Sequence, residues 1–293
     1  MKNSLQKPTN RIEKLWVKSS TVFIEGLAYI QGYNSPKFSD LHKYLCLKNI
    51  WTQELLEYEL GSIKRNELKA ISHEGKTYDY TASGTATKGL KGIELSNLDE
   101  GIYEILISVS SQREIKEYLN LTLALKKSLN ERSADNLFEY RLYQKNGKTY
   151  LSKRDIIGRN VPPESHVDVT ESWVKQTVVH VEGEFVVPGV DITEFNRSKY
   201  YLIAQKPITQ RQYVFELGQV KKTRLGKKIG NPFGDYDACY FATLGLKGID
   251  TTNFELGNYD LYVSLAYKSE IFSAKLNKCL EIAPDGSRLL VNV

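Results

Sequence analysis

Apolar and polar residues alternate with period two along several stretches of the chain. In residues 22–30 and again in residues 179–187, every second position is apolar or glycine. Residues 103–109 and 259–265 show the same alternation. Period two over such lengths predicts β-strands with one buried face, and convincing amphipathic helices are few. The pattern therefore predicts an all-β protein.

These stretches belong to two copies of an internal repeat. Trp-Val-Lys at residues 16–18 recurs at residues 173–175, a shift of 157 residues. Gly-Leu-Lys-Gly-Ile at residues 89–93 recurs at residues 245–249, where the shift is 156. A repeat of this size is longer than a solenoid unit of roughly 20–50 residues and has the size of a domain. We predict two related domains in tandem.

The start of one strand in each copy resembles strand F of immunoglobulin-like domains. Tyr103 and Tyr259 each follow a glycine by two positions and open an alternating stretch. In immunoglobulin-like domains a tyrosine here packs at a corner, with its hydroxyl bonded to nearby backbone; the alternative is an ordinary hairpin with a buried tyrosine. We predict two tandem immunoglobulin-like β-sandwich domains related by the repeat, with Tyr103, Tyr259, Trp16 and Trp173 in structural roles.

The repeat also sets the expected boundaries. We place the first sandwich at residues 1–155 and the second at residues 172–293, joined by a linker at residues 156–171 that contains two consecutive prolines. The copies differ chiefly by an insertion at residues 127–136, which is expected to be a surface loop.

Composition narrows the class of protein. The chain has 293 residues, of which 41% are hydrophobic and 26% charged, as in globular proteins with a buried core. The net charge of +5 favours an anionic partner but is far below the basic footprint of a dedicated nucleic-acid binder. No signal-peptide or membrane-spanning pattern is seen, so we expect a cytoplasmic protein. The three widely spaced cysteines are expected to be small buried hydrophobes.

Motifs of catalysis and metal binding are weak. The four histidines are isolated in sequence, and His180 is expected on a surface. Asp235-Tyr236-Asp237 matches the short Asp-x-Asp pattern of metal-dependent glycosyltransferases, but the first copy does not reproduce it. Glu182 and Glu184 share one strand, yet the first copy has Leu27 in place of Glu184. We expect no catalytic residue, no metal and no cofactor.

The most suggestive polar cluster is a basic loop in the second copy. Five cations fall within residues 221–228, and aromatic residues expected to be exposed follow them. Cations beside exposed rings could hold an anionic polymer, through charge-assisted hydrogen bonds and stacking on sugar faces; the alternative is a solvated loop. The candidate ligand-binding residues are Arg224, Lys227, Lys228, Phe233 and Tyr236, together with Lys64, Arg65, Tyr78 and Tyr80 of the first copy.

Taken in order, these motifs resemble a known kind of accessory module. The outward Glu-Gly strand, the basic loop, Tyr-Asp, Gly-Leu-Lys-Gly-Ile and the Gly-x-Tyr strand are similar to the tandem immunoglobulin-like modules attached to bacterial wall teichoic acid and capsule glycosyltransferases. The resemblance covers residues 14–155 and 170–293. It implies polymer binding or oligomer assembly, but no transferase activity, because a catalytic domain is missing.

The expected function is therefore non-catalytic binding of carbohydrate or another anionic polymer in cell-surface polysaccharide or teichoic acid assembly. Its partners would be an anionic polysaccharide or teichoic acid and a glycosyltransferase, without nucleic acid and without membrane insertion. The alternative is a scaffold that oligomerises or docks on a protein and binds no glycan, and a remote alternative is a glycosyltransferase-associated enzyme. Open strand edges favour a homo-oligomer.

Overall fold

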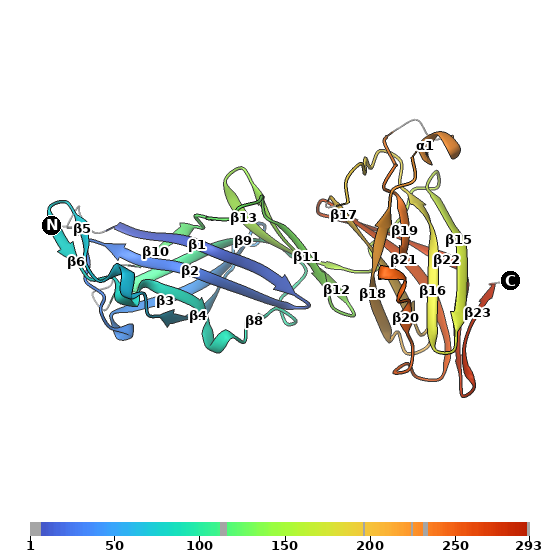
Figure 1. The fold of residues 1–293 in the computed structure, drawn as a ribbon, viewed down its shortest axis with the longest axis horizontal. Helices are drawn as coiled ribbons and strands as arrows, with labels where there is room; N and C mark the ends of the chain where they lie inside the picture. The colour runs from blue at the N-terminus through green and yellow to red at the C-terminus, as the bar shows by residue number, and fades with distance from the viewer. Residues whose placement is uncertain (1–6, 112–115, 196, 224, 231–233, 292–293) are drawn as a thin grey trace. The chain divides into compact units, whose positions relative to one another are not determined.

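The computed structural model describes residues 7–291 except 112–115, 196, 224 and 231–233. It divides into two compact units. The first comprises residues 1–133 and 139–153, and the second comprises residues 134–138 and 154–293. Both are built mainly from antiparallel strands, which confirms the predicted all-β class (Figure 1).

The first copy of the repeat forms a two-layer sandwich. Its strands are β1 Lys7–Lys18, β2 Thr21–Gln31, β3 Leu41–Asn49, β4 Leu55–Ile63, β5 Ile71–His73, β6 Lys76–Tyr78, β7 Gly84–Thr87, β8 Ile93–Glu94, β9 Gly101–Ser111, β10 Lys116–Asn120, β11 Asn130–Ala134, β12 Phe138–Lys145 and β13 Lys148–Asp155. They pair in the order β1-β2-β7-β4-β3-β9-β13-β12-β11, with β8 beside β2 and β10 beside β9. The predicted period-two faces are buried in β2 and β9.

One strand crosses between the two layers. The first half of β4 pairs with β3, and its second half, from Leu60 to Ile63, pairs with β7. In the second copy, residues 212–217 pair with β17 and residues 217–220 pair with β19. A glycine stands at the crossing in both copies, Gly61 and Gly218. The two sandwiches therefore share one topology, as the repeat predicts.

The second copy has the corresponding elements. They are β14 Arg159–Asn160, β15 His166–Lys175, β16 Val178–Val186, β17 Ser198–Gln205, β18 Gln212–Val220, α1 Leu225–Lys228, β19 Tyr240–Thr243, β20 Ile249–Asp250, β21 Gly257–Tyr267, β22 Glu270–Ala283 and β23 Gly286–Val291. The strand order is β14-β22-β21-β17-β18-β19-β16-β15. The core lies between the inner faces of β16 and β21, where Val181, Leu261 and Val263 are almost fully buried.

A β-bulge explains the repeated Glu-Gly motif. The register of β1 against β2 shifts at Glu13, and that of β15 against β16 shifts at Thr170. The extra residue brings backbone onto the facing glycine: a Cβ on Gly26 would lie 2.4 Å from the Arg11 carbonyl oxygen, and one on Gly183 would lie 2.2 Å from that of Asp168. A bulge turns a side chain out of the ladder, and it does so here at equivalent places in both copies.

The insertion of the first copy is not a surface loop, so that prediction is wrong. In the second copy, β22 runs along β21 with a register shift opposite Leu261. In the first copy the corresponding strand is split there into β10 and β13, and the intervening residues 121–147 include β11 and β12. Arg132 and Glu139 form an ion pair with both side chains 2% exposed. Charged residues that are buried as an ion pair look like exposed loop residues when only the hydrophobicity of the sequence is considered.

Both predicted tyrosine corners are present. The Tyr103 hydroxyl donates to the Asp99 carbonyl oxygen at 2.9 Å, and the Tyr259 hydroxyl donates to that of Glu255 at 2.8 Å. Both rings are buried. In both copies a tyrosine thus bonds backbone four residues upstream, which confirms the corner reading over that of an ordinary hairpin tyrosine.

The repeated tryptophans lie on the outer face of each sandwich. Trp16 stacks on Phe23 with ring centroids 5.0 Å apart, and Trp173 stacks on His180 at 4.6 Å. His180 is consequently 9% exposed, so its expected surface position is wrong. Cross-strand ring pairs of this kind stabilise the register of two strands.

A lysine stands in the core of the first sandwich at a position where the second copy has tyrosine. Lys43 in β3 is 1% exposed, and its Nζ donates to the carbonyl oxygens of Ala82 at 2.6 Å and Gly84 at 2.8 Å, and to Ser62 Oγ at 3.3 Å. Burial lowers the pKa of Lys43 to about 7. The second copy has Tyr200 at this position, and its hydroxyl donates to the Phe185 carbonyl oxygen at 2.9 Å.

Residues 156–171, assigned to a linker from the sequence, belong to the second unit. Ile156 is fully buried in a small cluster with Tyr201, Ile203, Ala266 and Ile271. Strand β14 pairs in parallel with β22, and β15 begins at His166. The second sandwich therefore begins before residue 172, the boundary expected from the sequence.

Candidate functional site

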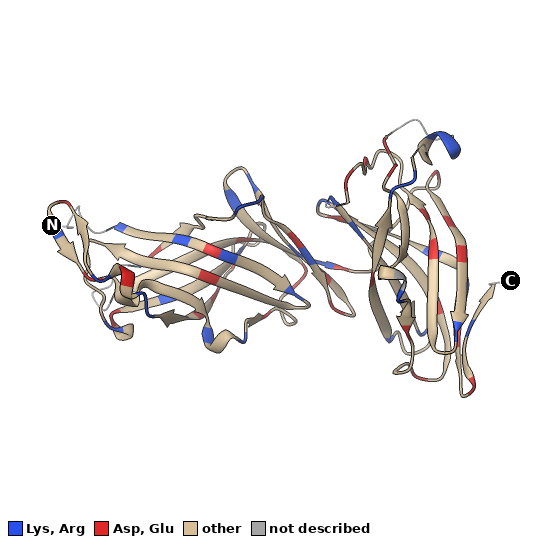
Figure 2. Ribbon diagram, in the orientation of Figure 1, with Lys and Arg blue, Asp and Glu red and all other residues tan. Residues whose placement is uncertain are grey.

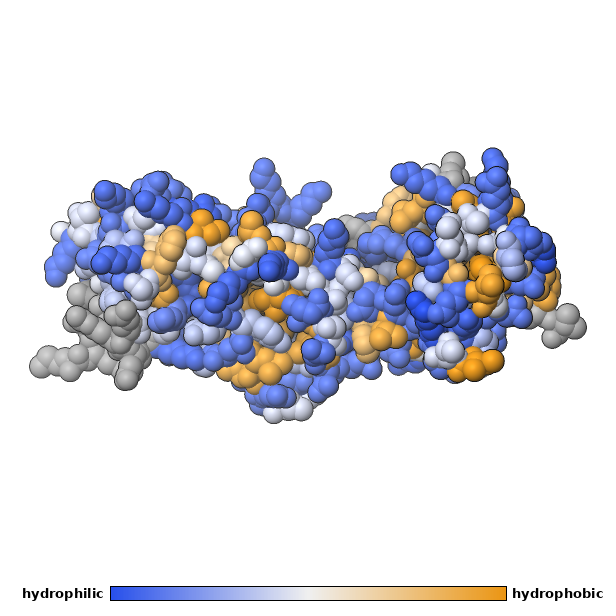
Figure 3. Space-filling view, turned by 90° about the horizontal axis from the view of Figure 1, so that it is seen from below, coloured by the Kyte–Doolittle hydropathy of each residue, from blue (hydrophilic) through white to orange (hydrophobic). Residues whose placement is uncertain are grey.

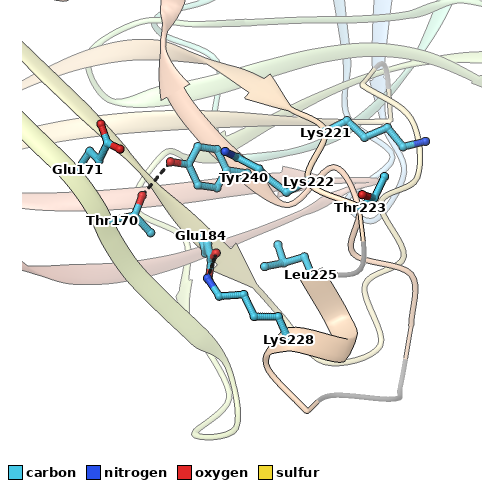
Figure 4. A pocket seen from close by; sticks show the side chains of 9 residues that line it. All are labelled: Thr170, Glu171, Glu184, Lys221, Lys222, Thr223, Leu225, Lys228 and Tyr240. Atoms are coloured by element: carbon cyan, nitrogen blue, oxygen red, sulfur yellow. Dashed lines mark hydrogen bonds and ion pairs between the residues drawn. The ribbon is translucent and has the colours of Figure 1, made fainter.

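The basic loop of the second copy forms one wall of a hollow. It leaves β18, forms α1, and lies over the neighbouring strands β15 and β16. The cavity has a volume of about 490 Å³ (Figure 4). Its lining combines basic, acidic and hydroxyl side chains: Thr170, Glu171, Glu184, Lys221, Lys222, Thr223, Leu225, Lys228 and Tyr240.

Glu184 lies at the base of this hollow, which we call the basic pocket. Its side chain is 5% exposed and accepts hydrogen bonds from Lys228 Nζ at 2.5 Å and from the His166 ring at 2.9 Å. Burial alone would raise the pKa of the Glu184 carboxyl, but the hydrogen bonds from Lys228 and His166 outweigh it and hold that pKa below its usual value. The same contact raises the pKa of Lys228. A buried carboxylate thus fixes one lysine of the loop to the sheet.

Tyr240 organises the opposite side of the basic pocket. Its hydroxyl lies 2.8 Å from Thr170 Oγ1 and donates to Glu182 Oε2 at 3.2 Å. Lys222 Nζ stands 4.5 Å from the centre of the ring, as a cation over an aromatic face. Because Thr170 is the bulged residue of β15, the bulge is what brings its hydroxyl to this ring.

The basic pocket therefore presents both signs of charge. Figure 2 shows basic residues on α1 and acidic ones side by side on β15 and β16. Lys221 and Lys222 are exposed at the rim, and among the described residues neither has an ion-pair partner. Ammonium groups donate to anionic oxygens, and carboxylates accept from hydroxyls. The arrangement suits a ligand that carries phosphate and hydroxyl groups close together.

The candidate residues of the second copy are not all in this pocket. Lys228 lines it, and Lys227 is exposed on the same short helix. Tyr236 is 1% exposed, so the prediction that its ring is free to stack on a ligand is wrong. Arg224 and Phe233 lie outside the described residues.

The candidate residues of the first copy are engaged differently from those of the second copy. Lys64 is exposed, whereas Arg65 is engaged with Glu13 at 2.8 Å. Tyr80 is 2% exposed, and half-buried Tyr78 stacks against it with centroids 6.0 Å apart. Its buried ring makes Tyr80, like Tyr236, unsuited to ligand stacking.

Tyr80 and Tyr236 are instead equivalent structural residues. The Tyr80 hydroxyl accepts the Gly32 N–H at 2.8 Å, and the Tyr236 hydroxyl accepts the Gly189 N–H at 3.2 Å. Asp235 Oδ1 accepts the backbone N–H of residue 237 at 3.1 Å. The first copy repeats this turn, where Asp79 Oδ1 accepts the backbone N–H of residue 81 at 2.9 Å. The Asp-x-Asp match is therefore part of a folded turn that both copies share.

The sequence pattern does not single out Thr170, Glu171 and Tyr240, which line the pocket, or His166, which bonds to Glu184. Glu184 is considered from the sequence but is assigned no role there. His166 and Glu184 are far apart in sequence but lie on paired strands. The available signal was the mismatch with the first copy, which has Leu27 at the position of Glu184 and Gly84 at that of Tyr240. A polar residue that replaces an apolar one at a buried position marks a site that the fold alone does not require.

The remaining chemistry is limited. Cys46 and Cys239 are free and buried, and burial is the main cause that raises the pKa of each thiol to about 12, whereas Cys279 is half-buried. Within the described ranges, no group of three or more His, Cys, Asp or Glu side chains is arranged to hold a metal ion. Among the same residues, no helix is long and apolar enough to cross a membrane.

Comparisons with known proteins find only remote likeness. No family model matches the chain, and no curated protein matches its sequence. A crystal structure of S. aureus TarS and one of S. aureus TarS 217-571 each align with a TM-score of 0.37, at 9% and 10% identity. Both alignments cover 92% of this chain, which spans 40% and 62% of those two chains. Likeness at this level assigns neither family nor activity.

Proposed function

We propose that the chain is a non-catalytic binding module, and that its second domain holds a phosphate-bearing polymer with free hydroxyls in the basic pocket. The polymer class that fits is a teichoic acid or another anionic cell-surface polysaccharide. We place the module in the cytoplasm, beside a glycosyltransferase that assembles the polymer. The free thiols of Cys46, Cys239 and Cys279 are compatible with a reducing compartment.

The observation that carries this proposal is the placement of the lysines. Lys228 is fixed by Glu184, and Lys222 is held over the Tyr240 ring, so two ammonium groups are positioned before any ligand arrives. Fixing side chains in advance lowers the entropy cost of binding. Lys221 adds a third ammonium group at the rim. The phosphate groups of the polymer would bind the rim lysines, and the polymer hydroxyls would donate hydrogen bonds to the Glu171 carboxylate.

Titration with purified teichoic acid by calorimetry tests the proposal. Binding should weaken steeply as salt rises past about 0.1 M, where the Debye length is about 10 Å. Replacement of both Lys221 and Lys222 by Gln should weaken binding about tenfold or more, since roughly 1.4 kcal/mol is tenfold in affinity. The melting temperature should hardly change, because exposed charges contribute little to folding.

A matched control separates the pocket from net charge. Lys91 and Lys145 are exposed on the first copy, and their double replacement by Gln removes the same charge from the other domain. This variant should bind like the parent. Equal loss in both double variants, or no binding by the parent at low salt, would contradict the proposal.

A second candidate function is docking or self-association through an apolar tip of the second domain. Ile208 is 95% exposed on the loop between β17 and β18, and Leu256 is 59% exposed. Glu255, next to Leu256, links the two segments, because its carboxylate accepts hydrogen bonds from Lys206 at 3.0 Å and from Arg211. On the face shown in Figure 3, hydrophilic side chains predominate and the apolar patches are small and separate. Exposed apolar patches mark interaction sites.

Sedimentation distinguishes the two candidates. If the tip is an interface, the parent should sediment as an oligomer at tens of micromolar, an order-of-magnitude range that populates moderate associations. Ile208→Lys should then yield a monomer without loss of polymer binding. A parent that stays monomeric removes self-association through this tip.

A further inference from the structure

The first domain contains a hollow that the proposed function does not use. It lies between the edge strand β1 and the segment that follows β10, and its volume is about 340 Å³. Sites for small ligands have volumes of roughly 300–1,000 Å³. The lining residues are Glu13, Lys14, Leu15, Trp16, residues 125–129 and Glu131. We call this hollow the Trp16 pocket.

Two anchors define the walls of the Trp16 pocket. At one end, Ile12 exchanges backbone hydrogen bonds with residues 122 and 124, both at 2.8 Å. At the other end, the Ser19 N–H donates to Ser133 Oγ at 2.7 Å. Between these anchors the chain stands away from the edge of β1, and the pocket occupies the gap. The insertion is thus a wall built alongside the edge of the sandwich.

The floor of the pocket is an aromatic face. Trp16 is half-buried, and Phe23 covers one side of its ring, since the two rings are nearly parallel at 5°. Because Phe23 lies on β2 and Trp16 on the edge strand, the other side of the indole is turned toward the edge and the insertion. A rigid aromatic face at the base of a hollow offers a flat apolar surface to a ligand.

Polar groups of both kinds surround this ring. Two of them are already compensated, because Lys14 pairs with Glu25 at 2.7 Å and Glu13 pairs with Arg65 at 2.8 Å. The exposed side chains of Lys126, Lys127, Ser128 and Glu131 complete the rim. Among the described residues, Glu131 has no ion-pair partner. The exposed rim thus carries two ammonium groups, one hydroxyl and one carboxylate, so it offers both hydrogen-bond donors and acceptors.

We propose that the Trp16 pocket binds one pyranose ring of a glycan. A pyranose has one face rich in C–H groups, which would pack on the indole, and hydroxyls at its edge, which both donate and accept. Glu131 would accept from a hydroxyl, and Lys126 or Lys127 would donate to another. The proposal is independent of the basic pocket, because it concerns a neutral sugar and the other domain.

The second domain supplies a natural comparison. Trp173 stacks on His180 in the same way and is 41% exposed, but the second copy has no counterpart of the insertion at residues 127–136. If an exposed stacked indole were sufficient, both copies would bind sugar. If the wall is required, only the first copy binds.

The test uses the whole chain and methyl glycosides of glucose, galactose and N-acetylglucosamine. Saturation-transfer NMR should show contact with the C–H face of at least one of them. In a chain carrying Trp51→Phe and Trp173→Phe, titration should change the fluorescence of Trp16. Trp16→Ala should weaken binding about tenfold, near the upper limit for an aromatic contact, and Trp173→Ala should leave it unchanged. Glu131→Gln should weaken it about threefold, because the amide oxygen still accepts a hydrogen bond but lacks the negative charge of the carboxylate.

A further variant tests the pocket without removing a side chain that stabilises the fold. Ser128→Phe fills the exposed side of the hollow and leaves the Trp16–Phe23 stack in place, so it should block binding without a change in melting temperature. The proposal is overturned if none of the glycosides shows saturation transfer, or if Ser128→Phe binds like the parent. It is also overturned if Trp173→Ala abolishes binding. Teichoic acid binding by the basic pocket should be unaffected by Ser128→Phe, so failure of one proposal does not imply failure of the other.

Discussion

Lys43 should make the stability of the first domain depend on pH in an unusual range. Burial lowers its pKa from the ordinary 10.5 to about 7, so the folded state holds fewer protons than the unfolded state between these values. Stability then rises with pH in that interval and is lower by a constant amount below it. At about 1.4 kcal/mol per pH unit, the whole interval corresponds to about 5 kcal/mol.

The perturbation is Lys43→Met, which keeps an unbranched side chain and removes the charge. Loss of the hydrogen bonds to Ala82, Gly84 and Ser62 shifts the stability of the variant by an amount that does not depend on pH. The informative quantity is therefore the slope of the unfolding free energy against pH. Between about pH 6 and pH 9, the wild type should gain about 2–3 kcal/mol relative to Lys43→Met.

The assay is urea unfolding followed by tryptophan fluorescence. In a Trp173→Phe background the remaining tryptophans, Trp16 and Trp51, both report on the first domain. Lys145→Met, at an exposed position, is the control and should follow the wild-type curve at every pH. Parallel curves of unfolding free energy against pH for wild type and Lys43→Met would refute the reasoning.

Three further predictions concern the second domain. Gly183→Ala should cost about 1–3 kcal/mol by overpacking, because its Cβ would meet the Asp168 carbonyl oxygen at 2.2 Å; Gly218→Ala, where the nearest atom would be at 3.5 Å, is the control in thermal melts. Tyr259→Phe should cost about 1 kcal/mol, the net value of one hydrogen bond, and an unchanged melting temperature would contradict the corner. The lowered pKa of Glu184 contributes stability that is present above the ordinary carboxyl value of 4.5 and is lost as pH falls through the lowered value. Acid titration should therefore show the wild type losing its advantage over Glu184→Gln only below the ordinary carboxyl pKa of 4.5, and a constant difference would argue against the pair with Lys228.

The sequence predicts the parts of this fold that rest on regular burial. The alternating faces of β2 and β9 and the corner tyrosines follow from local patterns that both copies repeat. The insertion does not, because Arg132 satisfies Glu139 across two strands and the pair looks solvated when each residue is read alone. Compensation between distant residues has no local signature.

The same reason limits prediction of the site. The basic loop is visible as a run of lysines, but its function as a pocket wall depends on Glu184 and on the bulge at Thr170, which lie on other strands. The prediction for Tyr236 is wrong because its neighbours in sequence are polar while its own ring is buried. Tyr236 sits in a polar loop sequence, yet its ring fills the core and its hydroxyl binds backbone.

The split between β10 and β13 also indicates where this fold can be engineered. The first copy shows that the strand beside β9 can be cut opposite Ile105 and carry residues 121–147 while the sandwich remains intact. The equivalent place in the second copy is the register shift opposite Leu261, at residues 276–278 of β22. A peptide tag or a small reporter domain inserted there would enter a permissive position, although it interrupts a strand and not a surface turn.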